Sequence, residues 1–299
     1  MKSSAANNSN ATTNNANQTT CTCISHETHD EERALYGLVH ACVNDVTFAG
    51  PADGESSLKE CRDICVVDSS FSLRYPLWHT SGFSLQNVSM DELTRAAIWY
   101  ARHGRISNST LGGIKAVREC TDISIDRSVI DSPEFGWMCH DLRLSNTTLT
   151  SEYPFFHSTG VSLDHVHMTG KYSLQYVDGL VIEDSVLDTK DAFWHAHNVT
   201  VRNSTIKGEY LGWYSDGLTL INCRIEGTQP LCYARNLSLI DCELVGCDLA
   251  FEYSDVNATI KGHVDSIKNP RSGMIFVDSV GEVIRDGSVY DCTGEVLVR

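Results

Sequence analysis

One pattern recurs at a constant step of nineteen residues along much of this chain and restricts its fold more than any other feature. Each unit contains an apolar-x-apolar-x-Asn/Asp-Ser-x-apolar segment, as at residues 123–130, 180–187 and 199–206. Such alternation of apolar residues indicates a strand. A unit of this length is too short for a strand, a helix and two loops, which argues against a TIM barrel and an α-solenoid. The period instead predicts one coil of short strands per unit, with identical positions stacked about 4.8 Å apart.

The repeat also predicts which side chains fill the interior of such a stack. Two apolar positions form interior ladders, Val43, Val66, Leu85, Ile106, Ile125, Leu144, Leu163, Ile182, Val201, Leu220 and Leu239, and Phe48, Phe71, Met90, Leu111, Ile130, Leu149, Met168, Leu187, Ile206, Ile225 and Leu244. A ladder of small residues is expected at a corner, namely Ser69, Ser109, Ser128, Thr147, Ser185, Ser204, Cys223 and Cys242. Asn, Asp or Gly precedes nearly every unit, from Asp63 and Gly82 to Asn236 and Asp255, because these residues accept the left-handed backbone of a tight corner.

Charge and composition narrow the possible partners and the domain organisation. The formal net charge is −16 and no apolar run is long enough to span a bilayer, so neither nucleic acid nor a membrane is an expected partner. Residues 1–20 are rich in Asn, Thr and Ser and lack the apolar segment of a secretory signal, so we expect a disordered tail. Without a signal, the 12 cysteines indicate reduced thiols in a cytoplasmic protein. The predicted domains are this tail, an N-terminal cap at 21–36, the solenoid at 37–286 and a C-terminal cap at 287–299.

All five tryptophans occupy one position of the repeat. They are Trp78, Trp99, Trp137, Trp194 and Trp213, and Phe156, Phe251, Lys59, Arg118, Gln175 and Cys232 share the position. The preceding residue is apolar in most coils and should point inward, so this tryptophan stripe is expected to face outward. Two interpretations follow. In the functional one, the stripe presents a flat aromatic surface of the kind that stacks on sugar rings. In the structural one, the stripe is covered by a partner or a terminal segment, or it staples neighbouring coils together.

Charged and polar residues beside the stripe form a candidate site. The predicted substrate-binding residues are the five tryptophans with Arg74, Arg95, Tyr100, Glu119 and Tyr210. The predicted catalytic residues are Lys190, Asp191, Glu209 and His195. Carboxylates in adjacent coils would lie about 5 Å apart and those two coils apart about 10 Å, as in retaining and inverting glycoside hydrolysis. A lyase would instead use Arg or Lys to acidify a proton next to a carboxylate.

The position directly after the stripe is expected to face inward if the strand stays regular. Its residues are Glu60, His79, Tyr100, Glu119, His157, Tyr176, His195, Tyr214, Tyr233 and Glu252. Interior carboxylates would then need partners, so a strand end turned to solvent stays an open alternative.

The cysteines suggest neither a disulfide framework nor a metal site. Cys120 and Cys139, like Cys223 and Cys242, are separated by one repeat and could approach disulfide distance, but small buried thiol ladders fit better. The spacing of Cys21, Cys23, His26 and His29 matches no standard zinc pattern. We therefore predict no metal and no cofactor.

Seven short motifs resemble the signatures of the domain-of-unknown-function 3737 family over about residues 30–285. They are Glu32-Arg-Ala34, Asp53-Gly-Glu55 with Leu58-Lys-Glu60, Tyr75-Pro-Leu-Trp78, residues 95–100, Lys190-Asp-Ala-Phe-Trp194, residues 208–213 and Ala250-Phe-Glu-Tyr253. This family is similar in architecture to pectin-lyase-like parallel β-helices, which implies an all-β, single-stranded, right-handed parallel β-helix of about 12 to 13 coils. The family has no established activity and supplies no catalytic residues, and the catalytic motifs of polygalacturonases and pectate lyases are not recognisable here.

Two functional hypotheses remain open. The aromatic and charged face binds or cleaves a carbohydrate, as a hydrolase or lyase does. Alternatively, the chain is a non-catalytic scaffold whose tryptophan stripe docks a protein partner or a second copy of itself.

Overall fold

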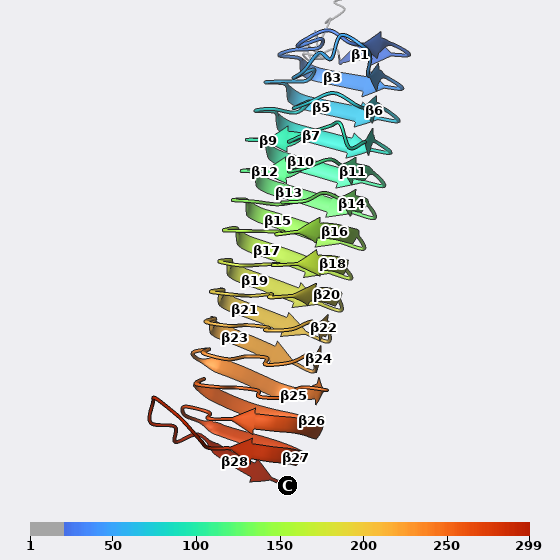
Figure 1. Cartoon of the computed structure of the whole chain (residues 1–299). Helices are drawn as coiled ribbons and strands as arrows, with labels where there is room; N and C mark the ends of the chain where they lie inside the picture. The colour runs from blue at the N-terminus through green and yellow to red at the C-terminus, as the bar shows by residue number, and fades with distance from the viewer. Residues whose placement is uncertain (1–20) are drawn as a thin grey trace, which may run out of the picture.

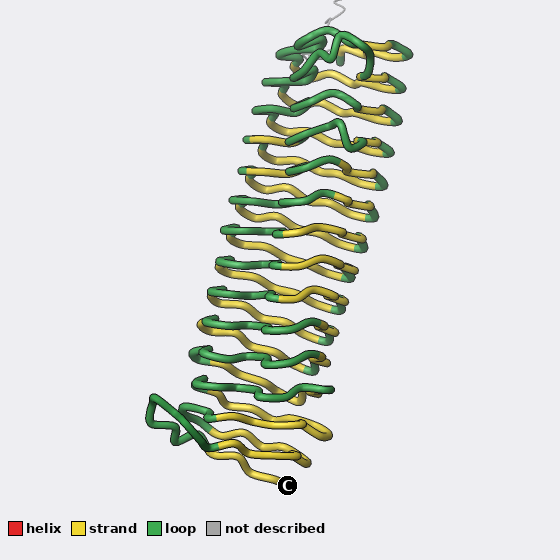
Figure 2. The backbone as a smooth tube through the Cα atoms, in the orientation of Figure 1, coloured by secondary structure: helices red, strands yellow, loops and turns green. Residues whose placement is uncertain are grey.

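The computed structural model describes residues 21–299, so the tail predicted at residues 1–20 lies outside the described residues. The described chain is a parallel β-solenoid whose coils follow one another along a single axis (Figure 1). Figure 2 shows strands and loops only, in agreement with the predicted all-β fold. No helix within residues 21–299 is long and apolar enough to cross a membrane.

One face of the solenoid, called the main face below, is a continuous parallel ladder. Its strands are β1 (Thr22–Ser25), β3 (Val39–Asn44), β5 (Arg62–Val67), β7 (Ser81–Gln86), β10 (Arg102–Ser107), β13 (Thr121–Asp126), β15 (His140–Ser145), β17 (Thr159–Asp164), β19 (Asp178–Glu183), β21 (His197–Arg202), β23 (Asp216–Ile221), β25 (Leu237–Val245), β26 (Val256–Lys268), β27 (Met274–Ile284) and β28 (Glu295–Val298). In the central coils the register advances by one repeat of the sequence from strand to strand, as in Ile182↔Val201 and Val201↔Leu220.

A second face is formed by shorter strands. They are β2 (Thr28–His29), β4 (Thr47–Phe48), β6 (Ser70–Phe71), β8 (Ser89–Met90), β11 (Thr110–Gly112), β14 (Val129–Asp131), β16 (Thr148–Glu152), β18 (His167–Lys171), β20 (Val186–Lys190), β22 (Thr205–Lys207) and β24 (Arg224–Glu226). The third side consists of turns, with one two-residue pairing between β9 (Ile98–Trp99) and β12 (Val117–Arg118). Most coils therefore have two faces of paired strands and one turn side, and backbone hydrogen bonds link the turn sides of successive coils as well.

The solenoid has more coils than predicted. Fifteen strands stack on the main face, whereas the sequence predicts 12 to 13 coils. The additional strands β1 and β28 lie in the segments assigned to the two caps, and both pair in parallel with their neighbours. The repeat pattern does not reveal β1, because Thr22 stands at its first apolar position and the next strand is followed by a longer step, Ala41↔Ile64. It does not reveal β28, because the step between paired residues shortens at Ala258↔Ile275 and lengthens at Ile275↔Val296.

The predicted core is confirmed. Every residue of both apolar ladders is buried, and so is the small ladder from Ser69 to Cys242. The predicted corner residues from Asp63 to Asn236 have positive φ angles, such as 52° at Asp63 and 49° at Asn236. Asp255 is not among them and instead accepts hydrogen bonds from Arg271 and Ser272.

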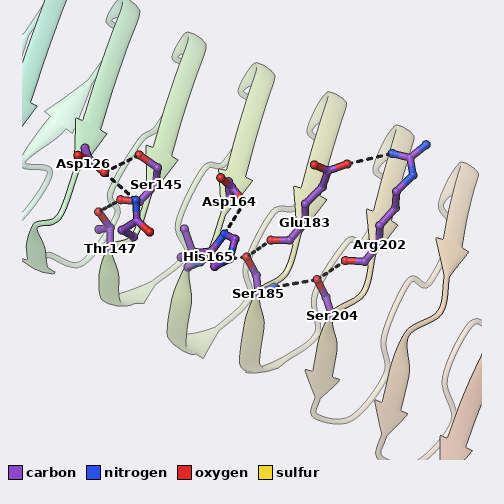
Figure 3. Close-up of polar contacts among 11 residues, drawn as sticks. Asp126, Ser145, Thr147, Asp164, His165, Glu183, Ser185, Arg202 and Ser204 are labelled. Atoms are coloured by element: carbon purple, nitrogen blue, oxygen red, sulfur yellow. Dashed lines mark hydrogen bonds and ion pairs between the residues drawn. The ribbon is translucent and has the colours of Figure 1, made fainter.

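The small ladder joins consecutive coils through its hydroxyl groups (Figure 3). The Ser185 hydroxyl donates to the carbonyl of Glu183 at 2.6 Å and accepts from the Val166 amide at 3.0 Å. The Ser185 amide in turn donates to the Ser204 hydroxyl at 3.0 Å. The corner thus pairs backbone amides that the strand ladders do not reach, and a buried amide without a partner is costly.

We expect Ser204→Ala to destabilise the solenoid, because it removes the acceptor for the buried Ser185 amide. The free energy of unfolding, measured in urea, should fall by about 1–3 kcal/mol. Ser204→Cys is the matched control, because Cys223 and Cys242 occupy the same position in the next two coils. Equal stability of Ser204→Ala and the unchanged protein would contradict this role of the small ladder.

Candidate functional site

The turn side alternates between right- and left-handed backbone, and this determines which side chains reach the surface. In one coil, Asp191, Phe193 and His195 have φ angles of 54°, 61° and 52°. L-residues adopt this conformation only at a cost, so its repetition from coil to coil is an imposed feature of the turn. Phe193 is buried, whereas Trp194 and His195 both lie at the surface.

This geometry corrects the inward orientation expected for the position after the stripe. His79, Tyr100, His157, Tyr176 and Tyr214 are all exposed. The expectation assumed a regular strand, but the left-handed residue rotates its side chain outward beside the preceding one. The stripe and the position after it therefore form two adjacent outward rows.

The outward orientation of the five tryptophans is confirmed, since each is half-buried on the surface. The same prediction is wrong for Phe251, which is fully buried. One extra residue enters that coil, so Phe251 follows Leu231 in the inward position, with φ angles of 66° and 62°. Tyr253, rather than Glu252, then stacks beside Tyr233 at 5.6 Å. Cys232, also assigned to the stripe, is buried as well.

Three of the five tryptophans staple neighbouring coils through hydrogen bonds. The indole N–H groups of Trp137, Trp194 and Trp213 donate to backbone carbonyls 16 residues ahead, at 2.6, 2.8 and 2.8 Å. At the same position, the Gln175 amide donates to the Asp191 carbonyl at 3.1 Å. Gln175 thus replaces tryptophan as a donor, whereas the buried indole nitrogens of Trp78 and Trp99 have no hydrogen-bond partner within the described residues.

The ring faces of the stripe are also used within the protein. Trp78 and Trp99 stack at 5.5 Å, and so do Trp194 and Trp213. Lys59 lies 4.1 Å from the centre of the Trp78 ring, and Arg118 lies 5.7 Å from Trp99 and 5.9 Å from Trp137. These cation–π contacts explain the positive charges in an aromatic row. Each indole of the stripe therefore contacts at least one neighbouring aromatic ring or cation within the protein.

The row after the stripe forms a second aromatic stack, called the ring ladder below. Its members are His157, Tyr176, His195, Tyr214, Tyr233 and Tyr253. The first four ring-to-ring distances are 4.8, 5.0, 5.1 and 4.9 Å, with interplanar angles of at most 20°. Tyr176 and Tyr214 are 42% and 44% exposed. Because the rings cover each other's faces, they present a row of polar edges to solvent, one per coil.

A hollow of about 240 Å³ adjoins the C-terminal half of the ring ladder. It is lined by four rings of the ladder with Arg235, Arg271 and Tyr290. Tyr290 belongs to the loop before β28, which projects from the stack (Figure 1), and its ring lies 5.0 Å from Tyr253. Arg271 pairs with Asp255, whereas exposed Arg235 forms no ion pair within the part of the chain that the structure describes. The hollow thus combines aromatic edges with an available guanidinium.

The structure gathers three of the four predicted catalytic residues. The Lys190 amine lies 3.9 Å from carboxylate oxygens of both Asp191 and Glu209. Asp191 is only 7% exposed. Burial raises the pKa of Asp191, Lys190 opposes this shift, and Glu209 adds to it. His195 lies instead between Tyr176 and Tyr214 in the ring ladder.

The predicted substrate-binding residues outside the stripe are divided among separate places. Arg74 pairs with Asp53 at 2.9 Å. Burial raises the pKa of Glu119, but hydrogen bonds from Arg118 and Tyr100 outweigh this effect, so the pKa of Glu119 is lowered. Arg95 lines a small hollow of about 130 Å³ with Trp99 and Arg118. Tyr210 packs edge-on against Trp213 at 5.4 Å and accepts the Trp194 indole bond through its carbonyl.

Sequence reasoning missed a polar hollow of about 450 Å³ on the main face. Its lining includes Asp63, His103, Arg105, Asp122 and Arg143. His103 and Arg143 each bond Asp122 at 2.9 Å, and these hydrogen bonds lower the pKa of Asp122. One available signal was Gly104, which stands where the neighbouring coils carry Phe83 and Ile123. The Phe83 ring occupies the space that a side chain at position 104 would take.

Possible metal ligands do not gather where the N-terminal motif would place them. Cys21 and Cys23 are exposed, His26 bonds Asp45, and His29 lies between Glu27 and Glu31. Among residues 21–299, one group brings three potential ligand atoms within 4.8 Å of one another, namely Asp164, His165 and Asp184, and all three are exposed.

Comparison with known families identifies this solenoid. A family model described as a protein of unknown function, DUF3737, matches residues 22–297. The chain belongs to the DUF3737 family. The resemblance seen in its motifs is thereby confirmed, and a comparison with curated proteins gives no match.

Several solved structures share the solenoid shape of this DUF3737 protein at low identity. PfbA, a surface adhesin of Streptococcus pneumoniae, is 10% identical with a TM-score of 0.36 over 78% of this chain and 70% of its own. A mutant tailspike of E. coli bacteriophage HK620, solved with a hexasaccharide, is 11% identical with a TM-score of 0.39, and the match covers 83% of this chain and 59% of the tailspike chain. The Azotobacter vinelandii mannuronan C-5 epimerase AlgE6 A-module is 10% identical with a TM-score of 0.31, and the match covers 87% of this chain and 89% of the module. These low scores describe shape and say nothing about activity.

We expect Trp194→Phe to destabilise the protein, because phenylalanine keeps an aromatic ring but loses the bond to the Tyr210 carbonyl. The loss in unfolding free energy should be about 1 kcal/mol, and Trp194→Ala should cost several times more. Trp194→Gln is the matched variant, since Gln175 makes the same bond. If Trp194→Phe and Trp194→Ala leave urea unfolding unchanged, the stripe does not staple the coils.

The raised pKa of Asp191 predicts a pH-dependent effect of Asp191→Asn. A carboxyl whose pKa is higher in the folded than in the unfolded state opposes folding increasingly as pH rises through the interval between the two values. Asp191→Asn should therefore stabilise the protein near pH 7, and its advantage should shrink as pH falls toward the unfolded Asp value of about 3.9.

The measurement for Asp191→Asn is urea unfolding across this pH range, with exposed Asp188→Asn in the same coil as the control. A lower unfolding free energy of Asp191→Asn near pH 7 would show instead that the ion pair with Lys190 stabilises the fold.

Proposed function

We propose that this protein binds an extended, acidic polysaccharide along the ring ladder. The observation that carries the proposal is the regular spacing of the ladder, at 4.8 to 5.1 Å from His157 to Tyr233. This spacing is comparable to the length of one sugar unit in an extended chain. A polysaccharide lying along the solenoid axis would meet one histidine or tyrosine edge per sugar.

The ring edges carry suitable groups for sugar hydroxyls. A tyrosine hydroxyl both donates and accepts, and a neutral imidazole has one donor and one acceptor. Stacking holds each ring between its neighbours, so little side-chain freedom remains to be lost when a ligand binds. The proposal therefore moves the ligand from the tryptophan stripe, where the indoles are engaged with neighbouring coils, to the adjacent row.

The hollow beside Tyr214 and Tyr233 supports a preference for acidic sugars. Arg235 is available there, and a guanidinium can bind a carboxylate through two parallel hydrogen bonds. The formal net charge of −16 would otherwise repel an anionic chain, so a favourable contact has to be local. Uronic acid units are sugars that match the spacing of the ring ladder and also carry a carboxylate.

Arg235→Gln tests the preference directly, with hexagalacturonate as the probe and cellohexaose as its neutral counterpart. Loss of a charged hydrogen bond should weaken hexagalacturonate binding about tenfold or more, as measured by calorimetry, and leave cellohexaose binding nearly unchanged. Tyr214→Phe, which keeps the stack but removes a hydroxyl, should weaken both ligands. Arg105→Gln in the main-face hollow is the matched control. If Arg105→Gln weakens binding while Arg235→Gln and Tyr214→Phe leave it unchanged, the binding site lies on the main face.

A second candidate function, cleavage of the bound chain, is favoured by the raised pKa of Asp191. A carboxyl whose pKa is raised by burial can act as a general acid, and Glu209 and Lys190 lie nearby. Cleavage would release new reducing ends from polygalacturonate, and Asp191→Asn would abolish that release without abolishing binding. Absence of reducing ends at every pH would restrict the protein to binding.

A further inference from the structure

The last strand of residues 21–299, β28, has one free edge within this part of the chain. Within residues 21–299 it pairs with β27 alone (Figure 1). An edge strand presents unpaired backbone N–H and C=O groups that can pair with another chain. Val298 and Leu297 on this strand are 61% and 39% exposed, so the edge is apolar as well.

The hydrogen bonds to β27 show which backbone groups lie on the free side. The amides of Glu295 and Arg299 donate to the carbonyls of Gly273 and Val277 at 2.9 and 3.1 Å. Successive residues of a strand point their backbone groups to opposite sides. The N–H and C=O groups of Val296 and Val298 therefore lie on the free edge.

The sequence of this strand, Glu295-Val-Leu-Val-Arg299, is self-complementary when two copies run antiparallel. With Leu297 at the centre, Val296 lies opposite Val298 of the partner subunit and can exchange two backbone hydrogen bonds with it. Symmetry repeats this pair, which gives four bonds. Glu295 lies opposite Arg299 of the partner subunit in a non-hydrogen-bonded pair, where side chains are closest.

We propose that two copies of this protein join tail to tail through β28. The opposite charges fit, because Glu295 and Arg299 form no ion pair within the described part of the chain and face each other twice across the two-fold axis. The apolar side fits too. Val296 and Val298 pair in register with the fully buried Ile275 and Val277, so the partner's copy of this strand extends the open end of the core.

The antiparallel arrangement also closes the assembly at two copies. A two-fold contact uses the same surface on both subunits, whereas head-to-tail stacking of the β28 edge on β1 would continue into a filament. The β1 strand, Thr22–Ser25, carries no charged side chain to match Glu295 and Arg299. Charge complementarity thus favours the closed dimer over the filament. This proposal does not depend on the proposed ligand.

Charge reversal at the two ends of the strand provides the test. The unchanged protein should sediment, at about 0.15 M salt, with twice its mass of 33.1 kDa at high concentration. Glu295→Arg and Arg299→Glu each place like charges opposite each other and should shift the mass toward the monomer. The double variant restores the pairs and should dimerise again, and an equimolar mixture of the two single variants should form heterodimers. Circular dichroism verifies that each variant is folded.

Three results would overturn the proposal. The unchanged protein could stay monomeric at every concentration. It could form filaments rather than a closed dimer. Finally, both single variants could dimerise as well as the unchanged protein, which would place the contact elsewhere, such as on the tryptophan stripe.

Discussion

The parallel backbone pairing between successive coils is the constraint on which the rest of the structure depends. It places equivalent residues one strand spacing apart, so any residue type that recurs at one position becomes a continuous row along the axis. The apolar rows form the core, the small hydroxyl row joins the corners, and the aromatic rows cover the turn side. A surface of such rows is periodic, and a ligand with a matching period fits it without any preformed deep cleft.

The left-handed residues of the turn side give this regular stack a surface with two adjacent aromatic rows. In a regular strand, Trp194 and His195 would point to opposite faces, but the left-handed backbone at His195 brings both to the outside. The two rows then have different roles. The indoles are fixed by hydrogen bonds and cation–π contacts to neighbouring coils, whereas the ring ladder keeps its polar edges free.

Much of this fold could be predicted from the sequence, because the repeat directly specifies the register. Interior ladders such as Val43 to Leu239 and corners such as Asn198 follow from one period and a few residue preferences. Local departures from the period could not be predicted in this way. One inserted residue buries Phe251, and altered spacing hides β28. The repeat predicts that the tryptophans share one stripe. It does not predict that an indole such as that of Trp194 donates to a carbonyl 16 residues ahead, because that bond depends on the geometry of the turn.

The candidate site shows the same division between what a period specifies and what geometry adds. Spacing alone places Lys190, Asp191 and Glu209 together, and the structure agrees. Spacing also places His195 with them, but the turn directs that ring into a stack with Tyr176 and Tyr214. The main-face hollow around Asp122 has no periodic signature beyond the glycine at position 104, so only the assembled coils reveal it.

In the proposed complex, ligand and solenoid share one period along the ring ladder. The most direct test is the affinity of oligogalacturonates of increasing length, measured by calorimetry at fixed ionic strength. The affinity should rise with each added sugar until the chain spans the ladder from His157 to Tyr253, and then level off. An affinity that is already maximal for one or two sugars would contradict a shared period.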